Sequence, residues 1–161
     1  MLELEKKLRV GGIMHWAHLA ELGVMNVPDR PGVAAVVFRS LGEAGVNVPF
    51  IVQSIDLQGQ THIVLCVAEK DRSRAISALQ GACAQLGKAV LREGPAVALV
   101  SVFGPDFRER PGIAAAIFTA LGNAGVNILA ISTSISTVSC LVRNQDLPQA
   151  LSALEAACEL P

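Results

Sequence analysis

Two short loops in the sequence have the composition of a binding site for a small zwitterion. Each places an acid, an arginine, a proline and a glycine directly before an apolar segment: Asp29-Arg30-Pro31-Gly32-Val33-Ala34 and Glu109-Arg110-Pro111-Gly112-Ile113-Ala114. Free backbone N–H groups and the dipole at a helix start suit a carboxylate. Glycine allows close approach to the backbone, and the acid can hold an ammonium by a charge-assisted hydrogen bond. A tight turn with a capping acid has the same composition, so the loops alone do not define a site.

The two loops belong to an internal repeat that spans most of the 161 residues. Pro31 recurs as Pro111, an offset of 80, and this offset holds as far as Ser54 and Ser134. Further along, Ser77 recurs as Ser152, an offset of 75, so the second copy lacks five residues. We place the deletion at the turn 56–60, because a turn tolerates a deletion best.

Each copy is predicted to form a strand, a helix, two strands and a second helix. The expected elements of the first copy are a strand at 21–27, a helix from Pro31 to Gly45, strands at 48–55 and 63–67, and a helix capped by Asp71 or Ser73 that runs to Leu86. Proline fits the first helical turn and glycine the position after the last. In the second copy we expect a strand at 97–103, helix closure at Gly125 and a second helix opening at Asp146.

The fourth strand of each copy is predicted differently. Residues 88–92 can supply it in the first copy, whereas we expect no strand after the last helix of the second copy. Residues 8–14 are then predicted to fill the vacant position, which gives modules at 16–94 and 95–161. Each module is small for an independent core, so shared buried surface is expected.

Composition argues against several functions. Aromatic residues make up 4% and the net charge is −1 with scattered basic residues, which disfavours nucleic acid. The N-terminus has no signal peptide and the chain no membrane-spanning apolar run, so we expect a cytoplasmic protein without membrane contact. The cysteines lie in apolar runs without a CxxC pair, which predicts buried free thiols: Cys66, Cys83, Cys140 and Cys158. His15 and His18 lack a companion cluster, so no metal is expected, and His62 has no obvious partner.

The segment from Val27-Pro28-Asp29-Arg30-Pro31-Gly32 to Ala44-Gly45-Val46-Asn47-Val48 resembles the ACT domain family, and more narrowly the regulatory region of aspartate kinases. Further similarity lies at Ile51-Val52-Gln53-Ser54, at Asn127-Ile128 with Ile131-Ser132-Thr133-Ser134, and at the leading Val10-Gly11-Gly12-Ile13. The resemblance implies an α+β fold with two ferredoxin-like βαββαβ modules, whose antiparallel four-stranded sheets carry helices on one face.

The resemblance also implies a function. It indicates a non-catalytic regulatory (β) subunit of aspartate kinase, without a cofactor, that mediates feedback inhibition of a catalytic alpha subunit. Nothing resembles the Lys-Phe-Gly-Gly opening of the family's kinase part, although an excised fragment of a longer chain would look identical. The implied effector is threonine or lysine, bound between ACT modules of a homodimer. Threonine is favoured because no second acid beside Asp29 is available for a lysine ammonium.

The residues carried over from the family motif form two groups. Those expected to bind the effector from the first copy are Asp29, Gly32, Val33, Ala34 and Gln53, and those from the second are Val126, Asn127 and Ile128. Gln53 could also be a partly exposed strand residue, and Asn127 an ordinary turn residue. The copies differ because Glu109, Ile113 and Thr133 replace Asp29, Val33 and Gln53. Whether loop 109–114 binds a ligand stays open.

Two other functions are compatible with the same pattern. An acylphosphatase-type hydrolase on a ferredoxin-like scaffold would recruit Arg30 and Asn47, but the acid in each loop favours a zwitterion over a dianion. A ligand-free ACT dimerisation module would use the same fold without any pocket.

Overall fold

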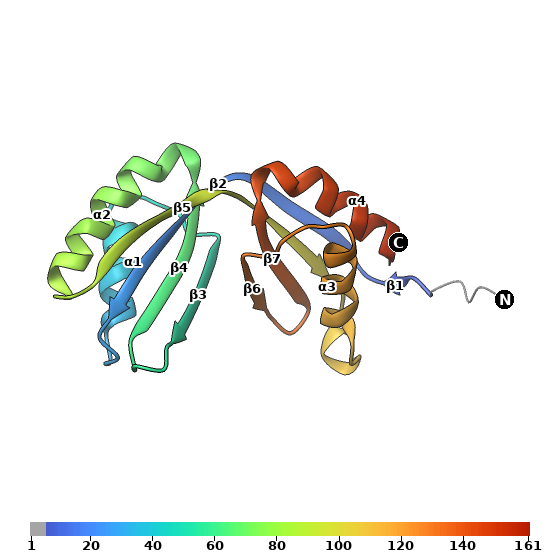
Figure 1. The fold of residues 1–161 in the computed structure, drawn as a ribbon, viewed down its shortest axis with the longest axis horizontal. Helices are drawn as coiled ribbons and strands as arrows, with labels where there is room; N and C mark the ends of the chain where they lie inside the picture. The colour runs from blue at the N-terminus through green and yellow to red at the C-terminus, as the bar shows by residue number, and fades with distance from the viewer. Residues whose placement is uncertain (1–5) are drawn as a thin grey trace. The chain divides into compact units, whose positions relative to one another are not determined.

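The computed structural model describes residues 6–161 and divides into two compact units. The first-repeat unit is His18–Ala96, and the second-repeat unit joins the described residues up to Ala17 with Val97–Pro161. Each consists of a β-sheet with α-helices packed against it (Figure 1). The predicted α+β fold of two ferredoxin-like modules is confirmed.

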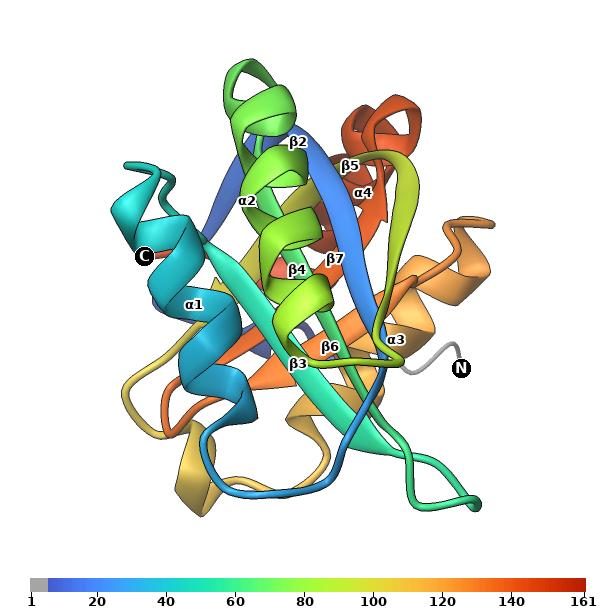
Figure 2. The same ribbon diagram turned by 90° about the vertical axis from the view of Figure 1, so that its left-hand side faces the viewer.

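The first-repeat unit has strand order β3-β4-β2-β5 with two helices on one face of the sheet (Figure 2). Its elements are β2 (Gly12–Val27), α1 (Val33–Glu43), β3 (Phe50–Ile55), β4 (Thr61–Ala68), a short 3-10 helix (Glu69–Asp71), α2 (Arg72–Gln85) and β5 (Val90–Phe103). β2 and β5 also extend into the second-repeat unit. Both α1 and α2 direct apolar side chains at the sheet, where they form one core with β2 and β4.

The second-repeat unit repeats this order as β2-β5-β7-β6, again with its helices together on one face (Figure 1). Its further elements are a 3-10 helix (Phe107–Glu109), α3 (Ile113–Asn123), β6 (Ala130–Thr133), β7 (Thr137–Arg143), a 3-10 helix (Asn144–Asp146) and α4 (Leu147–Ala157). A separate parallel pair joins β1 (Leu8–Arg9) to β8 (Cys158–Glu159). The expectation that no strand follows the last helix is therefore wrong.

The missing five residues of the second copy lie in the hairpin, as predicted. Phe50 pairs with Cys66, a separation of 16, whereas its counterpart Ala130 pairs with Leu141, a separation of 11. The difference is the five residues. The first copy therefore has longer hairpin strands joined by a five-residue turn, and β4 reaches far enough to pair with Val27 at the end of β2.

Helix ends agree with the sequence at their C-termini and differ at their starts. Gly45 and Gly125 follow the last turns with φ values of 69° and 72°, and the next N–H bonds back into the helix, as from Val46 to Leu41 O at 2.9 Å. Pro31 and Pro111 lie outside the helices, because the following glycine is left-handed and cannot be helical. Asp71 makes no capping hydrogen bond and pairs with Arg74 instead.

Candidate functional site

The first loop presents backbone donors at the start of α1. Gly32 is left-handed, with φ 94° and ψ −11°, and occupies the N-cap position of the 11-residue helix. The first N–H that returns to the loop comes from Val36 to Gly32 O at 3.1 Å, so the earlier N–H groups of the first turn stay available. No side chain caps this end. Such an end can bind a carboxylate through these donors and the helix dipole.

The predicted site residues of the first copy all lie in the first-repeat unit, with different exposures. Asp29, Gly32 and Gln53 are exposed and Ala34 is half-buried, whereas Val33 is a core residue. Gln53 pairs with the core residue Ile63 across β3 and β4, so its side chain lies on the helix-bearing side of the sheet. Val33 can therefore serve a ligand only through its backbone, while Asp29 and Gln53 offer side chains.

The other three predicted residues follow α3 in the second-repeat unit. Val126 is buried in that unit's core, and its N–H bonds to Leu121 O at 3.0 Å. Asn127 is exposed and Ile128 packs against the same core. Asn127 is thus the one of the three whose side chain is fully available to a ligand.

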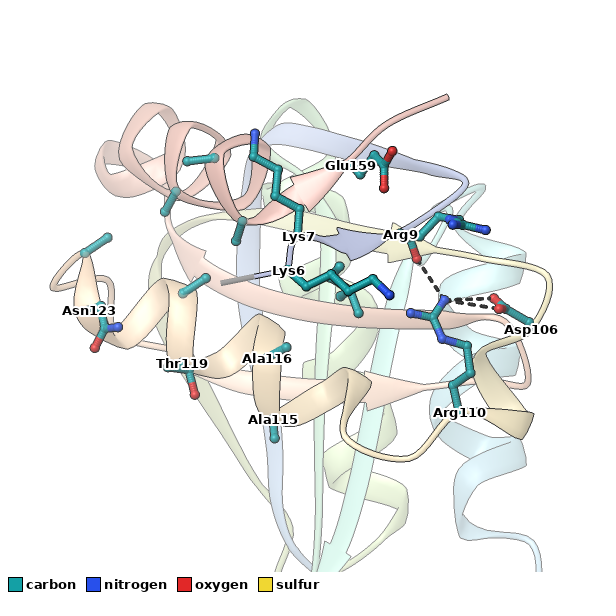
Figure 3. Close-up of a pocket in the computed structure, with 16 residues that line it drawn as sticks. Lys6, Lys7, Arg9, Asp106, Arg110, Ala115, Ala116, Thr119, Asn123 and Glu159 are labelled. Atoms are coloured by element: carbon teal, nitrogen blue, oxygen red, sulfur yellow. Dashed lines mark hydrogen bonds and ion pairs between the residues drawn. The ribbon is translucent and has the colours of Figure 1, made fainter. Parts of the chain in front are cut away.

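The second loop has the same helix start but a different approach to it. Gly112 is left-handed with φ 88°, and Ala116 N bonds to Gly112 O at 3.0 Å. Before it, Arg110 pairs with Asp106 at 3.1 Å and donates to the carbonyl of Arg9 at 3.0 Å (Figure 3). These contacts engage the loop arginine within its own unit.

A groove of about 1130 Å³ lies on the helix side of the second-repeat unit (Figure 3). Its lining combines small residues of α3 and α4, among them Ala116 and Thr119, with the basic residues Lys6, Arg9 and Arg110. None of the predicted effector residues contributes to it. We place the candidate site at the first loop, because its free helix N–H groups and exposed acid suit a zwitterion, whereas this groove is an alanine-rich surface.

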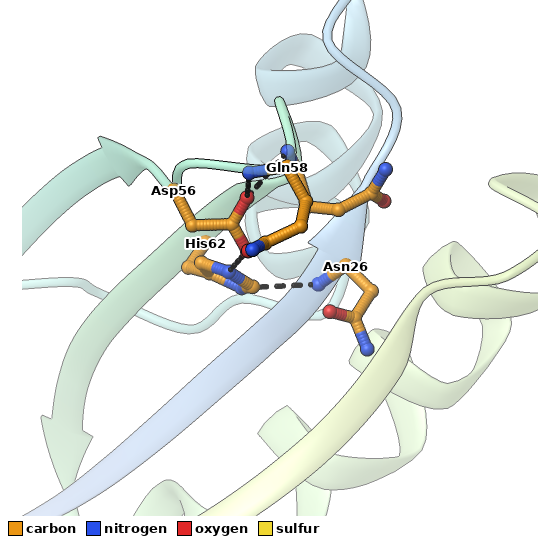
Figure 4. A network of polar contacts seen from close by, with 5 residues as sticks. Asn26, Asp56, Gln58 and His62 are labelled. Atoms are coloured by element: carbon orange, nitrogen blue, oxygen red, sulfur yellow. Dashed lines mark hydrogen bonds and ion pairs between the residues drawn. The ribbon is translucent and has the colours of Figure 1, made fainter.

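A polar network beside the first loop was missed from the sequence. His62 Nε2 lies 2.8 Å from Asp56 Oδ2, and the backbone N–H of Asn26 donates to His62 Nδ1 at 3.2 Å (Figure 4). The N–H of Gln60, and next the side chain of His62, hold the pKa of Asp56 below its ordinary value of 3.8. His62, for which the sequence showed no obvious partner, therefore has two. The available signal was an acid and a histidine on either side of one hairpin turn.

The remaining candidates for reactive groups are the cysteines and possible metal ligands. All four cysteines are buried free thiols, as predicted. Burial raises the pKa of the Cys66 thiol to about 12 and that of Cys140 to about 11, so both stay protonated and unreactive. Among the described residues, no cluster of three His, Cys, Asp or Glu side chains could hold a metal ion. Within residues 6–161, no helix is long and apolar enough to cross a membrane.

Comparison with known proteins gives consistent matches. The ACT domain family model matches residues 25–82 and 100–158. The aspartokinase of Mycolicibacterium smegmatis is 35% identical over 148 residues, which is 91% of this chain and 35% of that protein. The chain thus spans well under half the length of the curated relatives that it matches.

Two solved structures match nearly end to end. The ligand-free regulatory subunit of aspartate kinase from Thermus thermophilus is 32% identical with a TM-score of 0.82, over 93% of this chain and 99% of that one. A chain from a structure of aspartokinase alpha and beta subunits is also 32% identical, with a TM-score of 0.82, over 92% of this chain and 97% of its own length.

Proposed function

Because this chain belongs to the ACT domain family, and matches aspartate kinase regulatory subunits over most of its length, we propose that it is a non-catalytic regulator of an aspartate kinase. It binds an end-product amino acid, threonine in preference to lysine. Binding inhibits the catalytic alpha subunit by an allosteric route. The single observation that carries the ligand class is the open N-terminus of α1 behind left-handed Gly32, with the exposed carboxylate of Asp29 in the same loop.

The chemistry of this loop suits an α-amino acid. The free N–H groups of α1 donate to the ligand carboxylate, and Asp29 holds its ammonium by a charge-assisted hydrogen bond. Gln53 can then hydrogen-bond a side-chain hydroxyl, which threonine has and lysine lacks. The loop's other charged side chain is the cation Arg30, which would repel a lysine ammonium. These features favour threonine.

The pocket is completed, in this proposal, by a second copy of the chain. The Asp29 loop of one protomer faces residues 126–128 of its partner. Each unit supports this with an outer strand that carries exposed apolar side chains: Ile51 and Ile55 on β3 are 44% and 55% exposed, and Ile131 on β6 is 40% exposed. Open sheet edges of this kind favour pairing with another sheet. A ligand between the two protomers binds the paired state better than the separated state, and it therefore shifts the equilibrium towards the dimer.

We propose module boundaries at 16–94 and 95–161. Of residues 8–14, which were expected to complete the second sheet, Gly12–Met14 lie in β2, whereas Leu8–Arg9 pair with β8 in a separate parallel sheet. Residues 6–17 group with Val97–Pro161 in one compact unit, which supports this division. The catalytic partner is proposed from the relative solved as alpha and beta subunits.

A thermal-shift screen over the twenty amino acids tests the ligand class. A ligand that binds only the folded state stabilises it by RT ln(1 + [L]/Kd). We expect threonine to raise Tm most, and the same threonine concentration to promote the dimer in sedimentation. A ligand-free dimerisation module would show no shift with any amino acid. A monomer at saturating threonine would refute the proposed interface.

A further inference from the structure

A bulge in β2 lies directly before the candidate loop. Val24 pairs with Ile63 and Val27 pairs with Thr61, so three steps along β2 correspond to two along β4. Two residues of β2, Met25 and Asn26, therefore lie opposite His62. Asn26 takes a left-handed φ of 57°. A bulge leaves one residue out of the ladder and redirects its strand, and here the redirected strand leads within three residues to Asp29.

The side chain of His62 accepts a hydrogen bond from the bulge residue Asn26, which has no pairing partner in β4. The N–H of Asn26 donates to Nδ1 at 3.2 Å, so Nδ1 carries no proton and the remaining proton is on Nε2. Nε2 then donates to Asp56 Oδ2 at 2.8 Å. The other oxygen, Oδ1, accepts from the N–H groups of Gln58 and Gln60, each at 2.9 Å (Figure 4). The backbone of the hairpin turn thus holds the Asp56 carboxylate in place. The carboxylate selects the His62 tautomer, and this tautomer holds the N–H of the bulge residue Asn26.

We propose that His62 is a positioning residue for the effector loop. It holds Asn26 in its left-handed conformation, and this sets the direction in which β2 enters loop 28–32. Asp56 acts through His62 by holding the tautomer whose Nδ1 can accept. The inference rests on the proposed function, since it assigns the network to ligand binding by that loop.

The second copy lacks this hydrogen-bond network, so the network is specific to the first loop. The counterpart of His62 is Thr137 at the offset of 75, and Thr137 lies opposite the single residue Phe103, so the second copy has no counterpart of the bulge residue Asn26. β5 pairs with β7 without a register shift up to Phe103 and Thr137. The deletion in the hairpin removes the residues that would correspond to the Asp56 turn. The two loops therefore reach similar helix starts by different supports.

Two variants of His62 show whether its hydrogen-bond acceptor or its planar ring is needed. His62→Phe keeps a planar ring but offers no acceptor, whereas His62→Asn can place its amide oxygen where Nδ1 lies. We expect His62→Phe to weaken threonine binding about 3- to 10-fold, the range for one lost hydrogen bond. His62→Asn should recover most of the loss, and Thr137→Val in the second copy should bind as the wild type does. Equal affinity of His62→Phe and the wild type would overturn the proposal, as would His62→Asn binding no better than His62→Phe.

A third variant leaves the histidine in place, in case His62→Phe does not fold. In Asp56→Asn, Oδ1 keeps the turn amides and the new NH₂ donates to Nε2, which moves the ring proton to Nδ1, facing the Asn26 N–H. Nitrogen NMR of the imidazole should show this tautomer change, and threonine affinity should fall as in His62→Phe. An unchanged affinity with a changed tautomer would refute the positioning role.

Amide NMR of the ligand-free chain keeps this inference separate from the proposed function. If His62 positions the loop, the resonances of Asn26 and Gly32 shift in His62→Phe and return towards wild type in His62→Asn. This result supports the positioning role even if neither threonine nor lysine binds the wild type, an outcome that overturns only the proposed function. Unshifted Asn26 and Gly32 resonances would overturn the positioning role whatever the ligand.

Discussion

Replacing Gly32 by alanine perturbs the effector loop through its backbone alone. A Cβ added at Gly32 would meet no atom within 4 Å, so the substitution creates no clash. Its cost comes from the φ of 94°, which side chains disfavour by roughly 1–2 kcal/mol. Urea denaturation should report a loss of this size in the free energy of unfolding. If the variant relieves this strain by leaving the left-handed conformation, the N–H groups of the first turn of α1 no longer point at the ligand. Threonine affinity should then fall about 5- to 30-fold.

Two matched glycine variants show whether the effect is local. Gly112 has a φ of 88° and equally open surroundings, so Gly112→Ala should cost the same stability while leaving threonine affinity unchanged. Gly42 lies inside α1, also with nothing within 4 Å. Gly42→Ala should therefore stabilise the chain by about 0.5–1 kcal/mol. The reasoning is refuted if Gly32→Ala loses stability but binds threonine normally, or if Gly112→Ala weakens binding as much.

Three further results are expected. Asp29→Ala should weaken threonine binding by about 1.5–3 kcal/mol in calorimetry, the range for a hydrogen bond to a charged group, with the fold intact by circular dichroism. Leu79→Ala, at a fully buried position of α2, should cost about 2–5 kcal/mol in urea denaturation, whereas Leu57→Ala at a fully exposed position should stay within about 0.5 kcal/mol. Because the pKa of Asp56 is lowered in the folded chain, its stabilising effect is complete above pH 3.8 and is lost as pH falls through the lower folded value. The Gln60 amide resonance should titrate in that lower range, and a midpoint above 3.8 would contradict the turn geometry.

The repeat made much of the fold predictable. Residues at fixed offsets predict both pairs of helices, and the change of offset predicts the shortened hairpin, which the registers of Phe50 and Ala130 confirm. Glycine after the last helical turn has a local cause, since only a left-handed residue closes the helix in this way, and it was predicted at both Gly45 and Gly125.

Features set by tertiary pairing were not predictable in the same way. Residues 8–14 and 21–27 were expected as separate strands, but β2 runs from Gly12 to Val27 because neighbouring strands pair along it. The role of His62 depends on a spare N–H at a bulge, which leaves no pattern in the sequence. For the candidate site, the sequence indicated the residue types and the loop, and the structure adds which side chains are exposed and how the loop is supported.

Calorimetric titration of threonine into the whole chain, followed by lysine, is the most direct test of regulation through the first loop. Asp29→Asn and Glu109→Gln provide a matched pair, because each removes one negative charge from the same position of its copy. We predict one threonine per chain, with binding strongly weakened in Asp29→Asn and retained in Glu109→Gln. Absence of heat with both amino acids, or loss of binding in Glu109→Gln alone, would contradict it.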